Sequence, residues 1–244
     1  GSSGIGYATA KKFLNNNWKV IISSRSKKNL INAKSKILDK ELNKNLYIYE
    51  CDIANRNEVK KTINKIFTEV GDINIALLNA AAYSPNKNQN FSIENFEKLI
   101  DVNLKGTLYC IEMLLNKMKE DKSHIAIVSS PVGYRGLPTA GAYGLTKAGL
   151  TNLAENLFFD LKKLKIKISI INPGFIKSES TKLNEFPMPF LKTSEFAANK
   201  IYKGLIGRYK FEIFFPWFFL MIMKILRILP YKIYFYLIKK ITKL

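Results

Sequence analysis

The sequence predicts an α/β fold built on a Rossmann-type, doubly wound parallel sheet. Short apolar runs, flanked by turn or polar residues, alternate along the chain with longer amphipathic stretches. The apolar runs cover Val20–Ile22, Leu46–Tyr49, Ile75–Leu78, Ile125–Val128 and Ile168–Ile171. The amphipathic stretches lie near residues 8–16, 27–44, 56–69, 93–119 and 142–164. Strands that alternate with helices of this length indicate parallel strands joined by right-handed crossovers.

The composition is that of one large globular domain. The chain has 244 residues, of which 47% are apolar and 24% are charged, so it is too apolar for a disordered chain. His124 is the single histidine, and Cys51 and Cys110 are too far apart for a Cys-x-x-Cys pair. We therefore expect neither a metal site nor a disulfide-stapled secreted fold.

The net charge of +20 raises the question of a nucleic-acid partner. Most of the cations are lysines scattered along the chain, and the few arginines are isolated. Recognition of bases and phosphates favours arginines clustered on one face. We expect no nucleic-acid partner and interpret the lysines as a solvated surface.

A glycine-rich turn, Gly1-Ser2-Ser3-Gly4-Ile5-Gly6, opens the chain and runs straight into a helical pattern. Such a turn binds pyrophosphate because its amides and the helix N-terminus point at the anion, but the motif normally follows a strand. One interpretation is a remnant of an expression tag, which Gly-Ser-Ser-Gly resembles. The interpretation we favour is a dinucleotide turn whose first strand and opening glycine are missing from this chain. The strands at Val20–Ile22 and Ile75–Leu78 should then be separated by the gap of one strand.

A Tyr-x-x-x-Lys pair places a phenol and an ammonium group one helical turn apart on the same face. The spacing alone proves little, because it occurs at Tyr7/Lys11, Tyr83/Lys87, Tyr143/Lys147 and Tyr236/Lys240. Tyr143/Lys147 differs in its surroundings, because Ser129 and Ser130 end the strand before it and Asn103 lies further upstream. This combination makes Tyr143 and Lys147 the candidate reactive pair.

With these residues the sequence resembles the classical short-chain dehydrogenase/reductase family over nearly its whole length. The opening turn matches the last six positions of the family's TGxxxGxG motif, and Leu78-Asn79-Ala80-Ala81 is similar to its NNAG strand end, with two of the four positions changed. Asp52, in Cys51-Asp52-Ile53, matches the adenine-contacting aspartate, and Asn172-Pro173-Gly174 matches the PG motif beside the nicotinamide. Asn103, Ser130, Tyr143 and Lys147 match the catalytic tetrad.

The chemistry of such a tetrad follows from the reaction it serves. A carbonyl that receives a hydride develops negative charge on oxygen, so it needs a proton donor and a fixed hydrogen bond. Tyr143 is the expected acid/base, and the nearby charge of Lys147 should favour its ionised form. The resemblance further implies that Lys147 holds the nicotinamide ribose, Ser130 bonds the substrate oxygen and Asn103 orients a water behind Lys147.

Purely structural roles are the alternatives for these residues. Ser130 could cap a turn at a strand end, and Tyr143 could be a core aromatic with its hydroxyl at the surface. Asn103 could be a misfit within a helix, because asparagine is a poor helix former.

The choice of cofactor is expected at the end of the strand that starts at Val20. An acid there would bond the ribose diol of NAD, whereas an arginine accommodates the 2′-phosphate of NADP. Ser24 occupies the position of the acid, and Arg25 follows it, with Lys27 and Lys28 close behind. NADP(H) is therefore favoured over NAD(H), with a solvated loop charge as the alternative role for Arg25. The full expected cofactor-binding set is Ser2, Ser3, Gly4, Ile5, Gly6, Ser24, Arg25, Asp52, Ile53, Asn79, Ala80, Ala81, Tyr143, Lys147, Pro173, Gly174 and Ile176.

The segment from Phe175 to Thr193 follows the PG motif, where the resemblance places the substrate loop. It is apolar and stiffened by prolines at Pro187 and Pro189. It could close over an apolar substrate and exclude water, or it could be a surface loop packed on the body.

The expected function is NADPH-dependent reduction of an apolar ketone, or the reverse oxidation, with lipid-like ketones of the kind that ketosphinganine reductases accept among the candidates. A catalytically silent NADP-binding scaffold is the alternative.

A basic, apolar tail follows the expected last strand, Phe211–Phe215, so we divide the chain into a nucleotide-binding and catalytic domain at 1–216 and an extension at 217–244. Charges and prolines interrupt the tail, so it should not span a membrane. It has no acidic residue, and Lys232, Tyr236, Lys239 or Lys240, and Lys243 should form one helical stripe beside Ile233, Leu237, Ile238 and Ile241. We expect peripheral contact with the inner face of a membrane, or packing of the same apolar face on the domain or in a homodimer. A cytoplasmic homo-oligomer is the overall expectation.

Overall fold

The computed structural model describes residues 1–37, 40–85, 91–184 and 186–242. Lys243 of the expected basic stripe and Lys87 of the second tyrosine–lysine spacing lie outside these residues.

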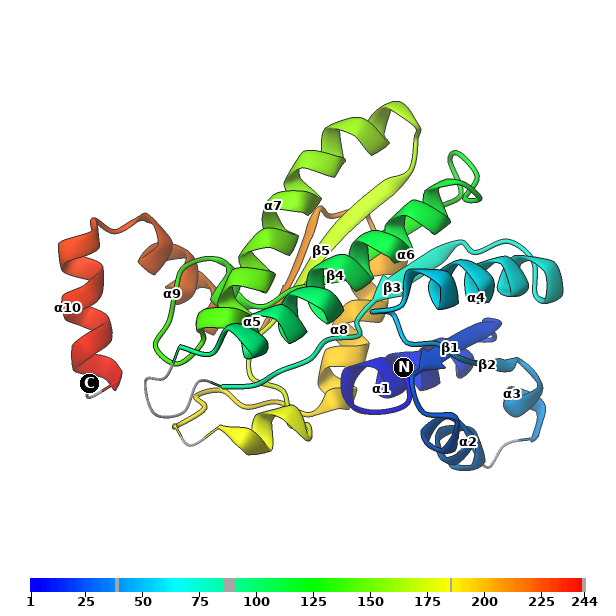
Figure 1. Cartoon of the computed structure of the whole chain (residues 1–244), viewed down its shortest axis with the longest axis horizontal. Coiled ribbons are helices and arrows are strands. Elements are labelled where there is room, and N and C mark those ends of the chain that lie inside the picture. Colours follow the sequence, from blue (N-terminus) through cyan, green and yellow to red (C-terminus); the bar gives the residue numbers. More distant parts are fainter. Residues whose placement is uncertain (38–39, 86–90, 185, 243–244) are drawn as a thin grey trace.

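Two parallel sheets form the centre of the molecule (Figure 1). The first pairs β1 (Val20–Ser24) with β2 (Leu46–Glu50). The second has the order β3-β4-β5-β6, with bounds Ile75–Leu78, His124–Val128, Lys167–Pro173 and Glu212–Phe215. No described strand pairs with both β1 and β3, and these two strands belong to separate sheets, as the sequence predicts.

Helices cover both faces of the larger sheet, as in a doubly wound fold. On one face α4 (Arg56–Glu69), α6 (Gly106–Leu115) and α7 (Gly141–Lys163) pack on β3 to β5. On the other face α1 (Gly4–Leu14) and α8 (Ser194–Ile206) pack on β4 to β6. β4 is buried at every position, which explains its uninterrupted apolar sequence. The predicted α/β Rossmann-type fold is thereby confirmed.

Two of the expected helices are subdivided. The stretch at 27–44 gives α2 (Lys27–Ser35) and α3 (Lys40–Lys44). The stretch at 93–119 gives α5 (Ile93–Leu99), a π-helical segment η1 (Ile100–Lys105) and α6. Wide π-type turns inside α-helices are frequent at functional sites, and this one contains Asn103.

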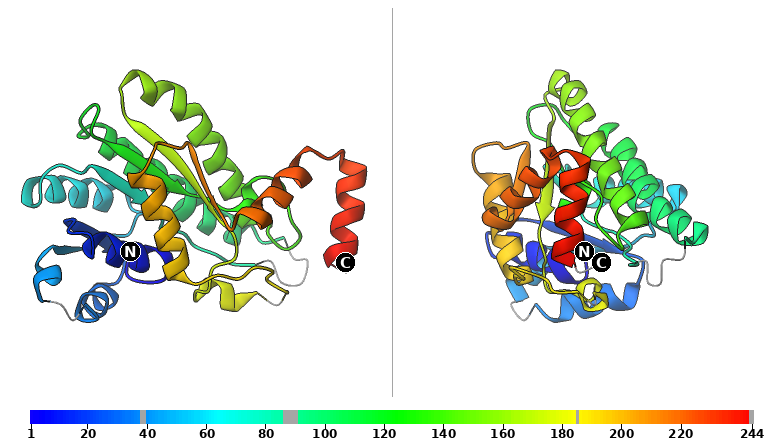
Figure 2. Two further views of the ribbon diagram at one scale, coloured as in Figure 1. Left: turned by 180° about the vertical axis from the view of Figure 1, so that it is seen from behind. Right: turned by 90° about the vertical axis from the view of Figure 1, so that its left-hand side faces the viewer.

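After β6 the chain forms a pair of helices, α9 (Trp217–Ile228) and α10 (Tyr231–Thr242), which we call the C-terminal hairpin. Figure 2 shows it standing out from the side of the body. It packs around Tyr134 through Leu220, Met223, Leu226, Tyr234 and Ile238. The Arg135 guanidinium donates to the carbonyl oxygens of Leu226, Arg227 and Leu229 and so fixes the corner between the two helices.

This packing covers half of the expected apolar stripe of the tail. Ile238 is buried and Leu237 is partly buried beside it, whereas Ile233 and Ile241 are exposed. The fold uses that side of α10 as an interface with the body, a contact that helical periodicity alone does not reveal. None of the described helices is long and apolar enough to cross a membrane.

Candidate active site

The glycine-rich turn lies against the ends of β1 and β3. The Gly1 nitrogen donates to the Ser23 carbonyl oxygen (2.7 Å). A Cβ on Gly6 would come within 3.0 Å of Asn79 Nδ2, so this position has no room for a side chain. Gly4 has φ +52°, a conformation that favours glycine, and begins α1 with no acidic residue in the first turn. A backbone this close to the strand ends, leading into a helix N-terminus, fits a dinucleotide pyrophosphate.

Asn103 is fully buried in the π-helical segment and connects two parts of the site. Its side chain accepts from the Ala82 backbone nitrogen (2.7 Å) and donates to the Ala82 carbonyl oxygen (3.0 Å). The same amide nitrogen donates to Thr146 Oγ1 (3.1 Å). Asn103 therefore holds the segment after β3 against the helix that carries Tyr143 and Lys147. The backbone carbonyl oxygen of Asn103 accepts a hydrogen bond from Thr107 Oγ1 (2.7 Å).

Lys147 is buried beneath the end of β4. Its Nζ donates to the Val128 carbonyl oxygen (2.8 Å) and lies 5.5 Å from the centre of the Tyr143 ring. The Ser129 hydroxyl donates to the Lys147 carbonyl oxygen (2.9 Å) and so ties β4 to α7. Because burial disfavours the charged ammonium, the pKa of Lys147 falls to about 8.

Tyr143 lies between Ser130 and Tyr83. Its ring meets that of Tyr83 edge to face, with the centroids 4.8 Å apart. Burial raises the pKa of Tyr143, and a hydrogen bond with the Ser130 side chain opposes that rise only in part. The pKa of Tyr143 is therefore raised and not lowered as expected, because burial disfavours the charged phenolate. The phenol is protonated at neutral pH and is suited to donate a proton.

The residues expected to bind the ribose end of the cofactor, Ser24 and Arg25, are less buried than Asn103 and Lys147. Arg25 is exposed and, within the described part of the chain, makes no ion pair. Ser24 lies opposite Glu50 in the β1–β2 register, and Glu50 accepts from the Lys27 backbone nitrogen (3.2 Å). Asp52 accepts from the Ala54 backbone nitrogen (3.0 Å), which fixes the turn after β2.

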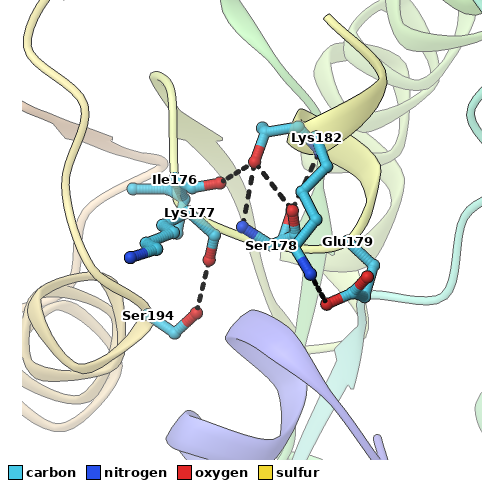
Figure 3. Close-up of polar contacts among 7 residues, drawn as sticks. Ile176, Lys177, Ser178, Glu179, Lys182 and Ser194 are labelled. Atoms are coloured by element: carbon cyan, nitrogen blue, oxygen red, sulfur yellow. Dashed lines mark hydrogen bonds and ion pairs between the residues drawn. The ribbon is translucent and has the colours of Figure 1, made fainter.

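The loop that follows the PG motif begins with a compact set of polar contacts (Figure 3). Thr181 Oγ1 accepts from the Ser178 backbone nitrogen (2.9 Å) and donates to the Ile176 carbonyl oxygen (3.0 Å). The Ser194 hydroxyl donates to the Lys177 carbonyl oxygen (3.2 Å). A Cβ on Gly4 would lie 3.8 Å from Ser178 Cβ, so these contacts place Ser178 beside the glycine-rich turn.

Further along, the same loop reaches the candidate catalytic tyrosine. The Tyr83 hydroxyl donates to Asn184 Oδ1 (2.5 Å), and Asn184 Nδ2 donates to Met188 Sδ (3.3 Å). Tyr83 in turn packs on Tyr143. The loop therefore contacts the candidate catalytic tyrosine indirectly, through Tyr83.

A half-buried carboxylate, that of Glu212, lies behind the PG motif. It accepts from Asn172 Nδ2 (2.8 Å), from the Tyr134 hydroxyl and from Lys224 Nζ on α9. Burial raises the pKa of Glu212, but these hydrogen bonds outweigh it and the pKa lies below its ordinary value. Next to it, a Cβ on Gly174 would come within 3.0 Å of the Phe219 ring and 3.1 Å of Pro216, so α9 packs closely on the PG motif.

Comparison with known proteins agrees with this geometry. Residues 1–186 match the family model described as short chain dehydrogenase. The chain belongs to the short-chain dehydrogenase family. The chain is 32% identical over 182 residues to an uncharacterized oxidoreductase of Myxococcus xanthus, covering 74% of this chain and 72% of that protein. It is 33% identical over 208 residues to the 3-oxoacyl-[acyl-carrier-protein] reductase FabG of Rickettsia typhi, covering 84% and 80%.

Solved structures of short-chain dehydrogenases share its fold. The structure of ElxO with NADP bound has a TM-score of 0.77 and 26% identity, and covers 88% of this chain and 94% of its own. A short-chain dehydrogenase from Streptomyces avermitilis has a TM-score of 0.79 at 18% identity, over 92% and 88% of the two chains, which shows the fold alone. The protein is thus an oxidoreductase of a family with NADP-bound members.

The structure of this short-chain dehydrogenase brings most of the predicted residues together in two groups. Contacts unite Asn103, Ser130, Tyr143 and Lys147 through Thr146 and the end of β4, and they place Asn79 against the glycine-rich turn. Ile176 is buried at the root of the loop, Ile53 packs against Gly106, and Ala80 and Ala81 are exposed. No direct contact joins Arg25 to either group within the described residues.

Sequence reasoning missed several residues that the site uses. Tyr83, Thr146, Ser178 and Glu212 were not singled out, and each contacts a predicted site residue or the turn. Position could have identified Thr146, which precedes Lys147, and Ser178, which follows the PG motif by four residues. Tyr83 and Glu212 gave no signal, because their contacts cross 60 and 40 residues of chain.

Proposed function

We propose that this short-chain dehydrogenase is an NADPH-dependent carbonyl reductase that also runs the reverse alcohol oxidation. The observation that carries the proposal is the convergence of a protonated phenol, a hydroxyl and a buried ammonium at one strand end. Tyr143 hydrogen-bonds Ser130 and lies beside Lys147, whose pKa of about 8 leaves it mostly charged at neutral pH. A proton donor, a fixed hydroxyl and a positive charge are what a developing alkoxide needs.

Each residue has a distinct role in this proposal. Tyr143 donates its phenolic proton to the carbonyl oxygen, and Ser130 holds that oxygen by a hydrogen bond. Lys147 stabilises the tyrosinate that remains and binds the nicotinamide ribose, while Asn103 positions α7 and orients a water behind Lys147. The nicotinamide supplies the hydride when it is bound.

The decisive experiment is oxidation of NADPH by the purified protein against a panel of ketones that runs from short water-soluble to long-chain compounds. We expect turnover that depends on both the ketone and Tyr143. NADPH binding without turnover on any ketone would instead identify the silent NADP-binding scaffold. Binding is measured separately, by the change in NADPH fluorescence.

The preference for NADP(H) over NAD(H) rests on Arg25. Arg25 is exposed directly after β1 and just before the N-terminus of α2, which supports a role in binding the 2′-phosphate. A charge-assisted bond to phosphate contributes about 1.5–3 kcal/mol, so Arg25→Ala should weaken NADPH binding by about 10- to 100-fold and change NADH binding little. Arg208→Ala, at an exposed arginine outside the site, is the matched control. Equal losses for both cofactors would show that Arg25 has a structural role.

The finer details of substrate and setting complete the proposal. The loop over the site exposes Leu183, Phe186, Phe190 and Leu191, which favours an apolar and lipid-like ketone.

We also propose a cytoplasmic homo-oligomer, since α6 and α7 expose Leu108, Leu145 and Phe159. Residues 1–216 would form the nucleotide-binding and catalytic domain, and the extension at 217–244 would contact the inner face of a membrane. Analytical ultracentrifugation tests the oligomer, with a strictly monomeric protein as the contradicting result.

A further inference from the structure

Helix α9 is apolar on two opposite sides, and only one of them is covered. Leu220, Met223 and Leu226 are buried against the body. The other side exposes 65% of Trp217, 58% of Phe218, 55% of Ile225 and 79% of Ile228. At 100° per residue these four fall within about one third of the helix circumference. A helix that is apolar on two opposite sides needs an apolar surrounding on each of them.

The charges of the hairpin indicate what kind of partner would cover the exposed apolar face of α9. The described part of the hairpin has no acidic residue, and Arg227, Lys232, Lys239 and Lys240 are exposed. Lys224 is not among them, because Glu212 holds its ammonium. A hairpin that combines an exposed apolar face with exposed cations and no acidic residue complements a surface of anionic lipids. A second copy would instead bring two sets of like charges together.

The exposed face of α9 is continuous with the loop over the site. The Phe190 ring packs on Phe218 with the centroids 5.7 Å apart, and Phe175 packs on Phe219 at 5.5 Å. From Phe190 the loop runs back to Asn184, which bonds Tyr83, and Tyr83 packs on Tyr143. The loop therefore contacts Tyr83, the neighbour of the candidate catalytic phenol, through Asn184 and contacts the apolar surface of the hairpin through Phe190.

We propose that the exposed face of α9 lies in the headgroup region of an anionic membrane, and that the adjoining loop receives its apolar ketone directly from that bilayer. This inference rests on the proposed reductase function for its substrate, but not for its membrane contact. It places the main contact on α9, because Leu237 and Ile238 of the expected stripe on α10 pack on the body. The lysines of α10 then contribute attraction to anionic headgroups.

Flotation of the full chain with vesicles tests the contact without any enzyme assay. The protein should float with phosphatidylcholine vesicles that contain one third phosphatidylglycerol, and raised salt should weaken the binding. Ile225→Ser should weaken partitioning about fivefold, whereas Ile31→Ser, at an isoleucine on α2 that is 53% exposed, should leave it unchanged. Lys239→Gln should also weaken it about fivefold, with Lys60→Gln on α4 as the matched control.

Enzyme assays test the delivery of substrate. The efficiency on a long-chain ketone dissolved in anionic vesicles should fall with Ile225→Ser about fivefold more than the efficiency on a short water-soluble ketone. A protein that floats but reduces no ketone would contradict the reductase function and leave the membrane contact standing. Failure to float on anionic vesicles at low salt, or dissociation of a dimer by Ile225→Ser without flotation, would overturn the inference.

Discussion

Two regions of this molecule contain the same tyrosine–lysine spacing and use it differently. Tyr143 and Lys147 lie on α7, where Lys147 is only 2% exposed and hydrogen-bonds the Val128 carbonyl oxygen. Tyr236 and Lys240 lie on α10, where Tyr236 is 66% exposed and Lys240 also faces solvent. The helix geometry of the two pairs is alike, so the spacing cannot be what makes a pair reactive.

The difference lies in the residues that surround each pair. On α7 the end of β4 contacts Lys147 and the Tyr83 ring packs on Tyr143. Burial raises the pKa of Tyr143 and lowers that of Lys147. On α10 water surrounds both groups and screens them. Matched substitutions at the two pairs therefore separate the effect of the environment from the effect of the motif.

The largest expected effect is the loss of turnover when the Tyr143 hydroxyl is removed. Tyr143→Phe removes the proton that no neighbouring group can supply, and loss of a general acid typically lowers the rate by about 10²–10⁴. Tyr236→Phe should leave the rate unchanged. Steady-state NADPH oxidation measures both, and NADPH binding should survive in each variant. If Tyr143→Phe keeps more than about a tenth of the parent turnover, Tyr143 is not the acid.

The lysines should show the next largest contrast. Lys147→Met removes the positive charge beside Tyr143 and should lower kcat by about 10- to 100-fold, the equivalent of one charge-assisted hydrogen bond. Lys240→Met should leave kcat within twofold of the parent. The same assay on one ketone measures both variants. Comparable losses at the two lysines would remove the distinction between the pairs.

The same lysine should destabilise the fold in a pH-dependent way. Because the pKa of Lys147 is about 8 in the folded chain and 10.5 ordinarily, the unfolded chain binds more protons between these values. Stability from this group is therefore lowest below pH 8 and rises as pH increases toward 10.5. Lys147→Met should raise the free energy of unfolding by about 2 kcal/mol at pH 7, after the loss of its hydrogen bond is deducted.

Urea unfolding at pH 7 and pH 10 checks the sign. The advantage of Lys147→Met over the parent should shrink at pH 10, whereas Lys240→Met should stay within about 0.5 kcal/mol of the parent at both values. An advantage that is equal at both pH values would show that Lys147 is not destabilised by its burial.

The sequence predicted the sheet well for a physical reason. Buried parallel strands are continuous apolar runs, so β2, β3 and β4 were found to within one residue. The four tetrad residues were predicted from their types and spacing together with the family resemblance, and the structure brings them together near the end of β4. β1 and β3 lie in separate sheets, as the strand order of a doubly wound fold led us to expect.

The remaining features depend on contacts between distant parts of the chain. The π-helical segment holds Asn103 against Ala82, a contact across 21 residues that leaves no local pattern. The partnered side of α10 depends on Tyr134 and Arg135, which lie about 100 residues earlier. The raised pKa of Tyr143 depends on how fully the fold excludes water, which residue spacing does not specify.

The smallest expected contrast concerns a hydroxyl next to each pair. Thr146 is fully buried, donates to the Tyr143 carbonyl oxygen (2.8 Å) and accepts from Asn103 Nδ2. Thr146→Val keeps the shape of the side chain but removes both bonds, so we expect a loss of about 1 kcal/mol in stability and about fivefold in kcat. Thr242, on α10, donates to the Ile238 carbonyl oxygen (2.7 Å), and Thr242→Val should change neither quantity measurably. If Thr146→Val lowers stability but not kcat, the Asn103 amide serves only to hold Ala82, because its link to the reactive helix would then be dispensable for turnover.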